Sequence, residues 1–310
     1  MYTGHICDVP GVKVGHASDM DALTGVTAIY CPEGAVPGVC VRGGAPGTRE
    51  TDLMKPGELV ESVNAIMLTG GSAFGLDAAT GMMDLLRRRG AGLDVGVARV
   101  PIVGGAVLFD LGVGASDVRP DAQMGRLALM LAGDDRRQGL IGAGMGASVG
   151  KFAPGAIPER SGLGSASIEL GGGVVIGAIA AVNAGGDIYD PYSGEFLAGG
   201  HDAQGAPRPV VDALMGGAAS RGSAGGNTTI AVVATNARLD KAQTNRLAAV
   251  AQDGFARAIR PVHTQMDGDT LFALSTGTAE FDFARLTVMA TEVVARAIAN
   301  AGYLTRERRA

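Results

Sequence analysis

Tryptophan is absent from this sequence, and aromatic residues make up only 4% of it. Proteins that bind single-stranded nucleic acid stack aromatic side chains on the bases, and this chain has few rings to offer. It also lacks a basic excess, because its net charge is −5. The arginine runs 87–89 and 136–137 are short and form no basic stripe. We therefore expect no nucleic-acid partner.

Cysteine is scarce as well, and the three residues Cys7, Cys31 and Cys40 have a spacing that fits no zinc site. We expect inert thiols in a reducing compartment. No uninterrupted apolar run reaches the roughly 18 residues of a membrane span. The first residues do not have the shape of a signal peptide. These features predict a cytoplasmic protein with no membrane partner.

Glycine is abundant, with 50 residues scattered among apolar segments in a chain of 310. This scatter excludes a collagen repeat and indicates tight turns and close backbone packing. The hydrophobic share of 46% permits a sizeable core at this length. No repeat and no clean linker divide the chain, so we expect a single domain over residues 1–310.

Strand and helix patterns alternate along the chain. Strands with buried or glycine-edged patterns are predicted at 64–69, 171–182, 229–235 and 270–275. Apolar residues at helical spacing predict a helix capped by Ser72, one at 124–132, one beginning near Asp240, and a last one that buries Leu286 to Ala297. Two stretches, 185–212 and 215–226, are predicted to be loops.

The segment 225–230 places a hydroxyl residue between a glycine-rich loop and a core strand. The Thr228 hydroxyl could attack the carbonyl of Asn227, and hydrolysis of the resulting ester would free the Thr228 amine. Such an amine has a pKa of about 7.7–8.0 and can act as base for its own hydroxyl near neutral pH. A Gly-Asn turn that merely starts a β-branched strand is the simpler alternative for this hexapeptide.

A second polar segment, 261–272, carries Asp267 and Asp269 just before a predicted strand. Two carboxylates there could hold an ammonium group or orient a hydroxyl. The alternatives are a polar turn or part of a calcium loop. The spacing of ligands that a calcium loop requires does not continue, so calcium is excluded.

Other motifs point away from cofactors. The run 70–75 precedes a helix but lacks the spacing of a P-loop or a dinucleotide fingerprint, so we interpret it as a turn that lines the active cleft. The four histidines, His5, His16, His201 and His263, form no metal-ligand pair. A Ser-His-Asp catalytic triad remains an alternative, although no G-x-S-x-G motif is present. We expect neither a metal nor an organic cofactor.

Nearly the whole chain resembles the DmpA-type self-processing aminopeptidase family, which also contains the nylon-oligomer hydrolases. The resemblance depends on several motifs in a fixed order. They are Gly11–His16, Thr24–Thr27, Leu68–Leu76, Gly142–Ala147 with Lys151, Asn183–Ala184, Gly226–Ile230, Val233–Asn236 and Met266–Phe272.

The resemblance implies an α+β fold, a four-layer αββα sandwich of the N-terminal-nucleophile type. It also implies autocleavage between Asn227 and Thr228 into fragments 1–227 and 228–310, which stay associated, and assembly into a homo-oligomer, for which we expect a tetramer. Roles follow by position. Thr228 is nucleophile and general base, Asn183 donates to the oxyanion, Lys151 stabilises developing charge or tunes the Thr228 hydroxyl, and Asp267 and Asp269 position the Thr228 amine.

Substrate contacts are expected from Phe109, Gly71 and Ser72. Some family members carry Tyr where this chain has Phe109, which cannot donate a hydrogen bond. The Asp-Gly-Asp form of 267–269 is closer to the nylon-oligomer hydrolases than to the aminopeptidases, which tend to have Ser and Glu there.

The sequence therefore predicts an amidohydrolase that acts on peptides or linear oligoamides through an acyl-enzyme. The alternatives are an aminopeptidase/D-esterase that requires a free substrate amine, an acyltransferase of the ornithine acetyltransferase type, and a binding protein that lost processing.

Overall fold

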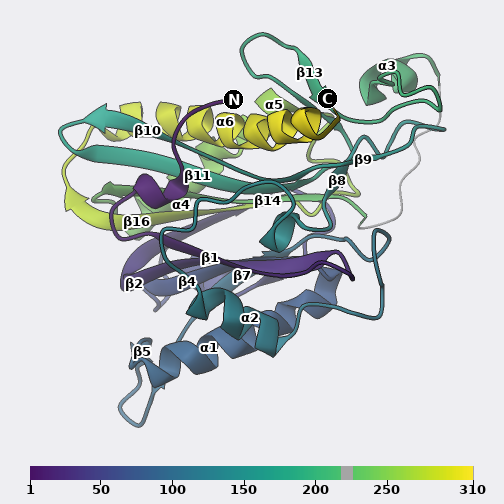
Figure 1. Ribbon diagram of the computed structural model, residues 1–310. Coiled ribbons are helices and arrows are strands. Elements are labelled where there is room, and N and C mark those ends of the chain that lie inside the picture. The colour runs from purple at the N-terminus through teal and green to yellow at the C-terminus, as the bar shows by residue number, and fades with distance from the viewer. Residues whose placement is uncertain (218–225, 310) are drawn as a thin grey trace.

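A computed structural model describes residues 1–217 and 226–309. Two packed β-sheet layers lie between an upper and a lower layer of helices (Figure 1). Three hydrophobic clusters separate these four layers: one under the upper helices, one between the sheet layers, and one above the lower helices. The αββα architecture predicted from the sequence is confirmed.

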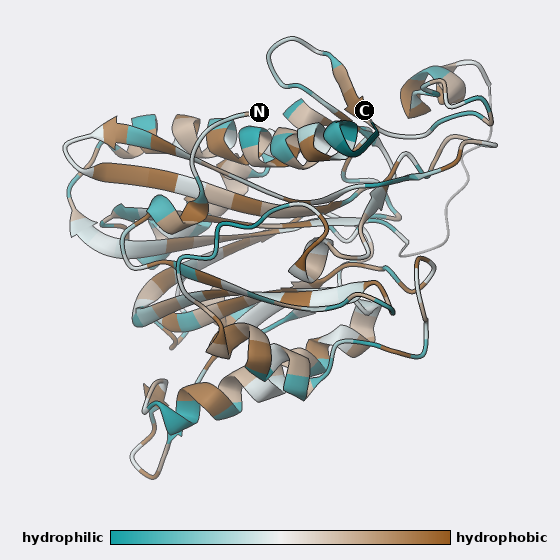
Figure 2. Ribbon diagram, viewed as in Figure 1, coloured by the Kyte–Doolittle hydropathy of each residue, from teal (hydrophilic) through white to brown (hydrophobic). Residues whose placement is uncertain are grey.

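The upper sheet layer carries the strand that begins at Thr228. Its strands pair in the order β10-β11-β14-β16, antiparallel except for the parallel pair β14–β16. Figure 2 shows hydrophobic segments along these strands, as expected for a sheet covered on both faces. The bounds are β10 Gly162–Gly171, β11 Val174–Asn183, β14 Thr228–Ala237 and β16 Thr270–Ala279.

One long strand, β2 (Thr24–Val41), connects the two sheet layers. Its last residues, Val36–Val41, pair with β16, whereas its first half pairs with β1 and β4 in the lower layer. The two layers are therefore parts of one hydrogen-bonded sheet, and β2 is the strand that belongs to both of them. The other strands of the lower layer are β1 Lys13–Asp19, β3 Thr48–Arg49, β4 Val63–Thr69 and β7 Val103–Val107.

The helices bury apolar stripes against the sheet layers. Upper helices α4 (Lys241–Ala251), α5 (Asp253–Ala258) and α6 (Phe283–Arg309) cover the upper sheet, and lower helices α1 (Ala78–Arg88) and α2 (Ala122–Met130) cover the lower one (Figure 1). Glycine allows the close approach of the lower pair. A Cβ on Gly81 would lie 1.7 Å from the Ala122 carbonyl oxygen, so only glycine fits there.

Short elements complete the described chain. Within residues 1–217 and 226–309, no helix has the length and apolar run that crossing a bilayer requires. The short elements are α3 Val210–Met215, 3-10 helices Ile6–Asp8, Asp52–Met54, Ser72–Asp77 and Gly142–Gly144, and strands β5 Leu93–Asp94, β6 Arg99–Val100, β8 Ser148–Val149, β9 Glu159–Arg160, β12 Asp187–Tyr189, β13 Phe196–Ala198 and β15 Ile259–Arg260.

Two of the loop and helix predictions differ from the structure. The predicted loop 185–212 contains β12 and β13, which pair with each other, and β12 also pairs with β15, far along the chain. The helix predicted from Asp240 is interrupted at Gln252, whose side-chain amide donates to the Cys40 carbonyl oxygen at 3.0 Å. Most of the loop predicted at 215–226, residues 218–225, lies outside the described residues.

Ser72 is not a helix cap, contrary to the prediction. It has a φ of 53° and begins a 3-10 helix, and α1 starts only at Ala78. Its backbone N–H donates to the Leu108 carbonyl oxygen at 3.0 Å, which ties this turn to the end of β7 rather than to a helix.

Candidate active site

Thr228 is the first residue of β14, in the middle of the upper sheet layer, and is 3% exposed. It pairs across the antiparallel ladder with Asn183, the last residue of β11. Its hydroxyl donates to the carbonyl oxygen of Asn227, the preceding residue. The backbone N–H of Gly268 donates to the same oxygen at 2.9 Å. Two donors therefore polarise the carbonyl at which cleavage is expected.

Lys151 binds the carbonyl of Gly226, one residue before Asn227. The segment around it is held by two backbone hydrogen bonds, from Gly150 to Gly186 at 2.9 Å and from Phe152 to Gly185 at 3.1 Å. The Lys151 ammonium donates to the Asn183 carbonyl oxygen at 3.0 Å, to Asn183 Oδ1 at 2.9 Å and to the carbonyl oxygen of Gly226, also at 2.9 Å. Burial lowers the pKa of Lys151 to about 7.

The Asn183 side chain is fully buried and its orientation is fixed by its partners. Its Oδ1 accepts from the Ser148 backbone N–H at 3.0 Å as well as from Lys151. Its Nδ2 donates to the Phe109 carbonyl oxygen at 2.9 Å. The amide proposed as an oxyanion donor is thus adjacent to Thr228 but engaged by Phe109 in this structure.

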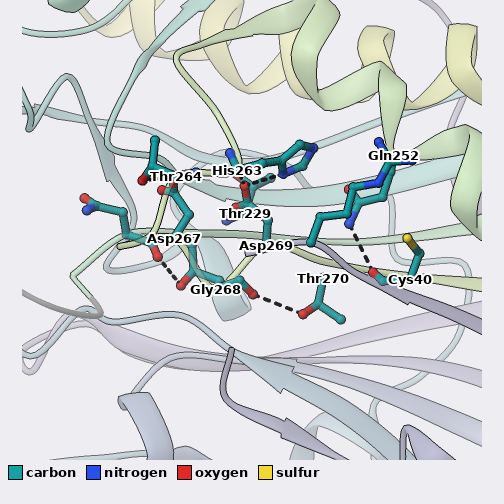
Figure 3. Close-up of polar contacts among 12 residues, drawn as sticks. Cys40, Thr229, Gln252, His263, Thr264, Asp267, Gly268, Asp269 and Thr270 are labelled. Atoms are coloured by element: carbon teal, nitrogen blue, oxygen red, sulfur yellow. Dashed lines mark hydrogen bonds and ion pairs between the residues drawn. The ribbon is translucent and has the colours of Figure 1, made fainter. Parts of the chain in front are cut away.

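The two aspartates lie on a turn beside β14 (Figure 3). Asn227 forms an isolated parallel β-bridge with Asp267. Asp267 accepts from the backbone N–H and the hydroxyl of Thr264, at 2.7 and 2.5 Å. Burial, and secondarily the charge of Asp269, raises the pKa of Asp267.

Asp269 connects the same turn to the nucleophile strand. It accepts from the Thr229 backbone N–H at 2.7 Å and from the His263 backbone N–H at 3.0 Å, and it contacts His263 Nδ1 at 2.8 Å (Figure 3). These contacts hold His263 at a φ of 58°, an unfavourable backbone conformation for a residue with a side chain. Among the described residues, neither carboxylate hydrogen-bonds Thr228 itself. Their effect on Thr228 runs through the position of the turn.

Two cavities flank Phe109. The first, about 150 Å³, is lined by Thr228, Ser72, Phe109 and neighbours from 45–47 and 107–108. The second, about 360 Å³, is lined by Lys151, Ser148, Arg160, Gly226 and Phe109. Phe109 lines both cavities, and Ser72 lines the first.

Gly71 does not line either cavity. Its backbone N–H donates to Asp110 at 2.7 Å, and the Thr24 hydroxyl donates to the same carboxylate, also at 2.7 Å. Gly71 therefore supports the loop that carries Phe109.

Sequence reasoning did not find five groups that the structure places here: the Gly268 N–H, Thr264, the His263–Asp269 pair, Asp110 and Arg160. A backbone N–H is independent of residue type, so Gly268 left no signal of its own. Asp110 directly follows Phe109, a candidate substrate contact, and that adjacency was the available signal for it. In the part of the chain that the structure describes, no group of His, Cys, Asp and Glu could hold a metal ion.

Comparison with solved structures shows the same fold. The L-aminopeptidase D-Ala-esterase/amidase of Ochrobactrum anthropi, described as a variant of the Ntn hydrolase fold, superposes with a TM-score of 0.71 at 20% identity, covering 97% of this chain and 88% of that one. A β-aminopeptidase of Burkholderia sp. gives 0.69 at 23% identity, covering 96% and 85%.

Sequence relatives are closer. An uncharacterized aminopeptidase of Mycobacterium bovis is 44% identical over 288 residues, covering 88% of this chain and 81% of the relative. A 6-aminohexanoate-oligomer endohydrolase of Paenarthrobacter ureafaciens is 38% identical over 276 residues, covering 87% and 74%. A family model described as Peptidase family S58 matches residues 4–307. The resemblance inferred from the motifs is confirmed: the chain belongs to peptidase family S58 and is a hydrolase of amide bonds.

Proposed function

We propose that this single-domain chain cleaves itself between Asn227 and Thr228, and that the fragments 1–227 and 228–310 remain associated as an N-terminal-nucleophile amidohydrolase. The observation that carries the proposal is that two donors converge on the carbonyl oxygen of Asn227. The Thr228 hydroxyl and the Gly268 N–H both donate to Asn227 O, and Lys151 holds the adjacent Gly226 carbonyl.

In the first step, Thr228 Oγ1 attacks the Asn227 carbonyl carbon and the Gly268 N–H stabilises the oxyanion. The hydroxyl proton passes to the Thr228 nitrogen, the C–N bond breaks, and an ester forms on Oγ1. Water then hydrolyses the ester, which leaves a carboxylate on Asn227 and a free amine on Thr228. That amine, with a pKa of about 7.7–8.0 when unperturbed, is the general base in turnover.

In turnover, Thr228 Oγ1 attacks the carbonyl carbon of a substrate amide, the amine product leaves with a proton, and water releases the acyl group. We propose that Asn183 and Lys151, which lie next to Thr228, stabilise the oxyanion of turnover. Asp267 and Asp269 set the position of the turn and, through Thr229, of the new amine. The substrates we propose are peptides or linear oligoamides, including nylon oligomers. The relatives are named as aminopeptidases and oligomer endohydrolases, which favours water over an amine as acyl acceptor.

Intact mass under denaturing conditions tests the nucleophile. Wild type is expected to separate into fragments 1–227 and 228–310, whereas Thr228→Ala stays uncut and loses amide hydrolysis by roughly 10⁴-fold or more. Thr229→Val is the matched control, because the neighbouring Thr229 hydroxyl is buried without a partner in the described structure. An uncut wild-type chain that hydrolyses amides would remove the free-amine mechanism.

We further propose a cytoplasmic homotetramer. The three cysteines are free, which suits a reducing compartment. The β5–β6 hairpin exposes Val95 and Val97, at 49% and 96%, which suits burial against another copy. Light scattering on a sizing column measures the assembly, and a monomeric mass contradicts it.

A further inference from the structure

His263 lies on the turn before β16 and contacts Asp269, one of the two carboxylates beside the nucleophile strand (Figure 3). Its ring packs on Phe255 of α5, with the ring centroids 5.7 Å apart and the planes inclined by 26°. Its Nδ1 is 2.8 Å from Asp269 Oδ2, and a carboxylate can only accept, so Nδ1 carries a proton and donates it. Its Nε2 is buried with no partner among the described residues. Nδ1–H is therefore the one hydrogen bond that the ring makes there.

The backbone of His263 is held in a conformation that costs energy. Its φ is 58°, in the left-handed region that few residues with a side chain adopt. Strain of this kind persists where the surrounding structure imposes it, and it clusters at functional sites. The backbone N–H and the ring N–H of His263 both donate to Asp269 Oδ2, at 3.0 and 2.8 Å. The strained turn therefore directs two donors to one carboxylate oxygen.

The other oxygen of Asp269 serves the nucleophile strand. Oδ1 accepts from the Thr229 N–H at 2.7 Å, and the residue is only 1% exposed. Self-cleavage creates an amine on Thr228, one residue before Thr229. That amine acts as a base only in its neutral form. A neighbouring carboxylate with few donors stabilises the ammonium form instead, and so raises the pKa of the amine.

The other charged groups around the new amine have partners of their own. Asp267 accepts twice from Thr264, at 2.7 and 2.5 Å. Lys151 donates to three oxygens, and Asp110, whose charge acts on Lys151, accepts from two donors. None of these contacts involves the histidine ring. Replacement of the ring therefore changes the hydrogen bonding of one carboxylate only.

We infer that His263 is a positioning residue for the base of turnover: its Nδ1–H occupies Asp269, so that this carboxylate fixes the start of β14 without capturing the new amine of Thr228 as an ammonium ion. The inference rests on the proposed Thr228 mechanism and adds a residue to it. His263 touches no substrate and passes on no proton. Without its ring donor, the negative charge of Asp269 attracts the ammonium form more strongly, and the pKa of the amine rises.

Two substitutions separate the hydrogen bond of the ring from its packing. His263→Phe keeps an aromatic ring against Phe255 and loses the donor. His263→Asn loses the stacking but keeps an N–H donor near the position of Nδ1, and asparagine tolerates a positive φ better than most residues. We expect His263→Phe to raise the midpoint of the acid limb of kcat/KM by about 0.5–1 pH unit, and His263→Asn to keep the wild-type midpoint.

The pH profile is measured with 6-aminohexanoyl p-nitroanilide on processed enzyme, because the substrate amine, like that of lysine, titrates near pH ~10.4. The expected shift lowers kcat/KM of His263→Phe by roughly 3- to 10-fold at about pH 6.5, and the loss fades near pH ~9.5. The ratio of variant to wild type cancels the titration of Lys151, which both enzymes share. A role in packing alone lowers the rate at every pH and leaves the midpoint in place.

A labelling experiment gives the same quantity without turnover. Trace acetic anhydride acetylates only the neutral amine, so the pH dependence of acetylation at Thr228, located by mass spectrometry, reports its pKa. The midpoint should be higher in processed His263→Phe than in wild type and His263→Asn.

Equal midpoints in wild type and His263→Phe overturn the inference, as does an equal rise in both variants or a failure of both to self-cleave. The Thr228 mechanism survives these results, because wild type is cut and active. An uncut His263→Phe beside a cut His263→Asn supports the inference, since the donor is then the difference between them. An uncut wild-type chain contradicts the mechanism itself.

Discussion

The two sides of the Asn227–Thr228 bond are built differently. On one side, the carboxylates of the turn 263–269 accept hydrogen bonds from nearby protein groups: Thr264 donates twice to Asp267, and His263 and Thr229 donate to Asp269. On the other side, Lys151 and Arg160 line an open cavity, and Arg160 has a donor without a partner in the described structure. The turn is held by its own hydrogen bonds, whereas the cation side borders a cavity. Substitutions in the turn should therefore cost more than substitutions on the cation side.

The largest effect is expected from Asp269→Asn. Asparagine has a single acceptor oxygen, so it cannot serve both Thr229 and His263, and one buried N–H is left unpaired. We expect the unfolding free energy to fall by about 1–3 kcal/mol, measured in urea on the uncut Thr228→Ala background. Displacement of the turn should also slow self-cleavage by roughly 100-fold in an otherwise wild-type chain. Asp117→Asn, on the surface, is the control, and equal behaviour of the two variants would show that the turn is not preorganised.

Gly268→Ala should have the next largest effect. A Cβ there would lie 2.7 Å from Thr228 Oγ1 and 2.8 Å from the Ala45 carbonyl oxygen, so the turn must shift away from the scissile carbonyl. We expect self-cleavage to slow by about tenfold. The rate is measured as the decay of the uncut band on a gel with time. Gly133→Ala, where a Cβ meets nothing closer than 3.9 Å, is the matched control. Cleavage of Gly268→Ala at the wild-type rate would contradict a role for its N–H.

The smallest effect concerns the charge of Lys151. Its lowered pKa of about 7 means that the ammonium form is complete well below pH 7 and is lost as pH rises through that value. Three oxygen acceptors surround Nζ, which matches the three donors of the ammonium form. Self-cleavage of wild type should therefore lose a few-fold in rate between about pH 6 and pH 8, and Lys151→Arg should lose this step because its charge persists.

Rates from pH-jump experiments followed by gel densitometry measure this step. A wild-type rate that instead rises through pH 7, with the rise absent in Lys151→Arg, would assign Lys151 the role of a neutral base. That result would also mean that Lys151 acts without a charge, so that Arg160 alone would be the cation on its side of the Asn227–Thr228 bond.

Local patterns predicted several of the longer elements, including the two strands that flank the site. Runs of β-branched and apolar residues indicate a buried strand. They predicted a strand from residue 229, where the structure begins it at Thr228, and a strand from Thr270, where the structure also begins it. Asp240 was expected to begin a helix, and its side chain caps α4 by accepting from Gln243 N. Strands β12 and β13 were missed, because their pairing partners are remote in sequence or carry no strand pattern of their own.

The site was predictable only as a set of residues. Thr228, Lys151, Asn183, Asp267 and Asp269 were named from motifs, and the structure brings them to one end of the upper sheet layer. Their contacts were not predictable. The engagement of Asn183 by Phe109 and the pairing of Asp269 with Thr229 depend on how β11, β14 and the turn before β16 pack together.

The sequence by itself determined that a hydroxyl residue opens a core strand behind a glycine-rich segment, and that the chain has the motifs of one hydrolase family. These are local properties, set by residue order. Only the tertiary structure decided that Gly268 offers its N–H to Asn227, and that Lys151 loses solvent and with it part of its basicity. It also decided that Arg160 lines a cavity and has no ion-pair partner among the described residues. Those features arise from pairing between strands distant in the chain, and hydrogen bonding and desolvation depend on that proximity.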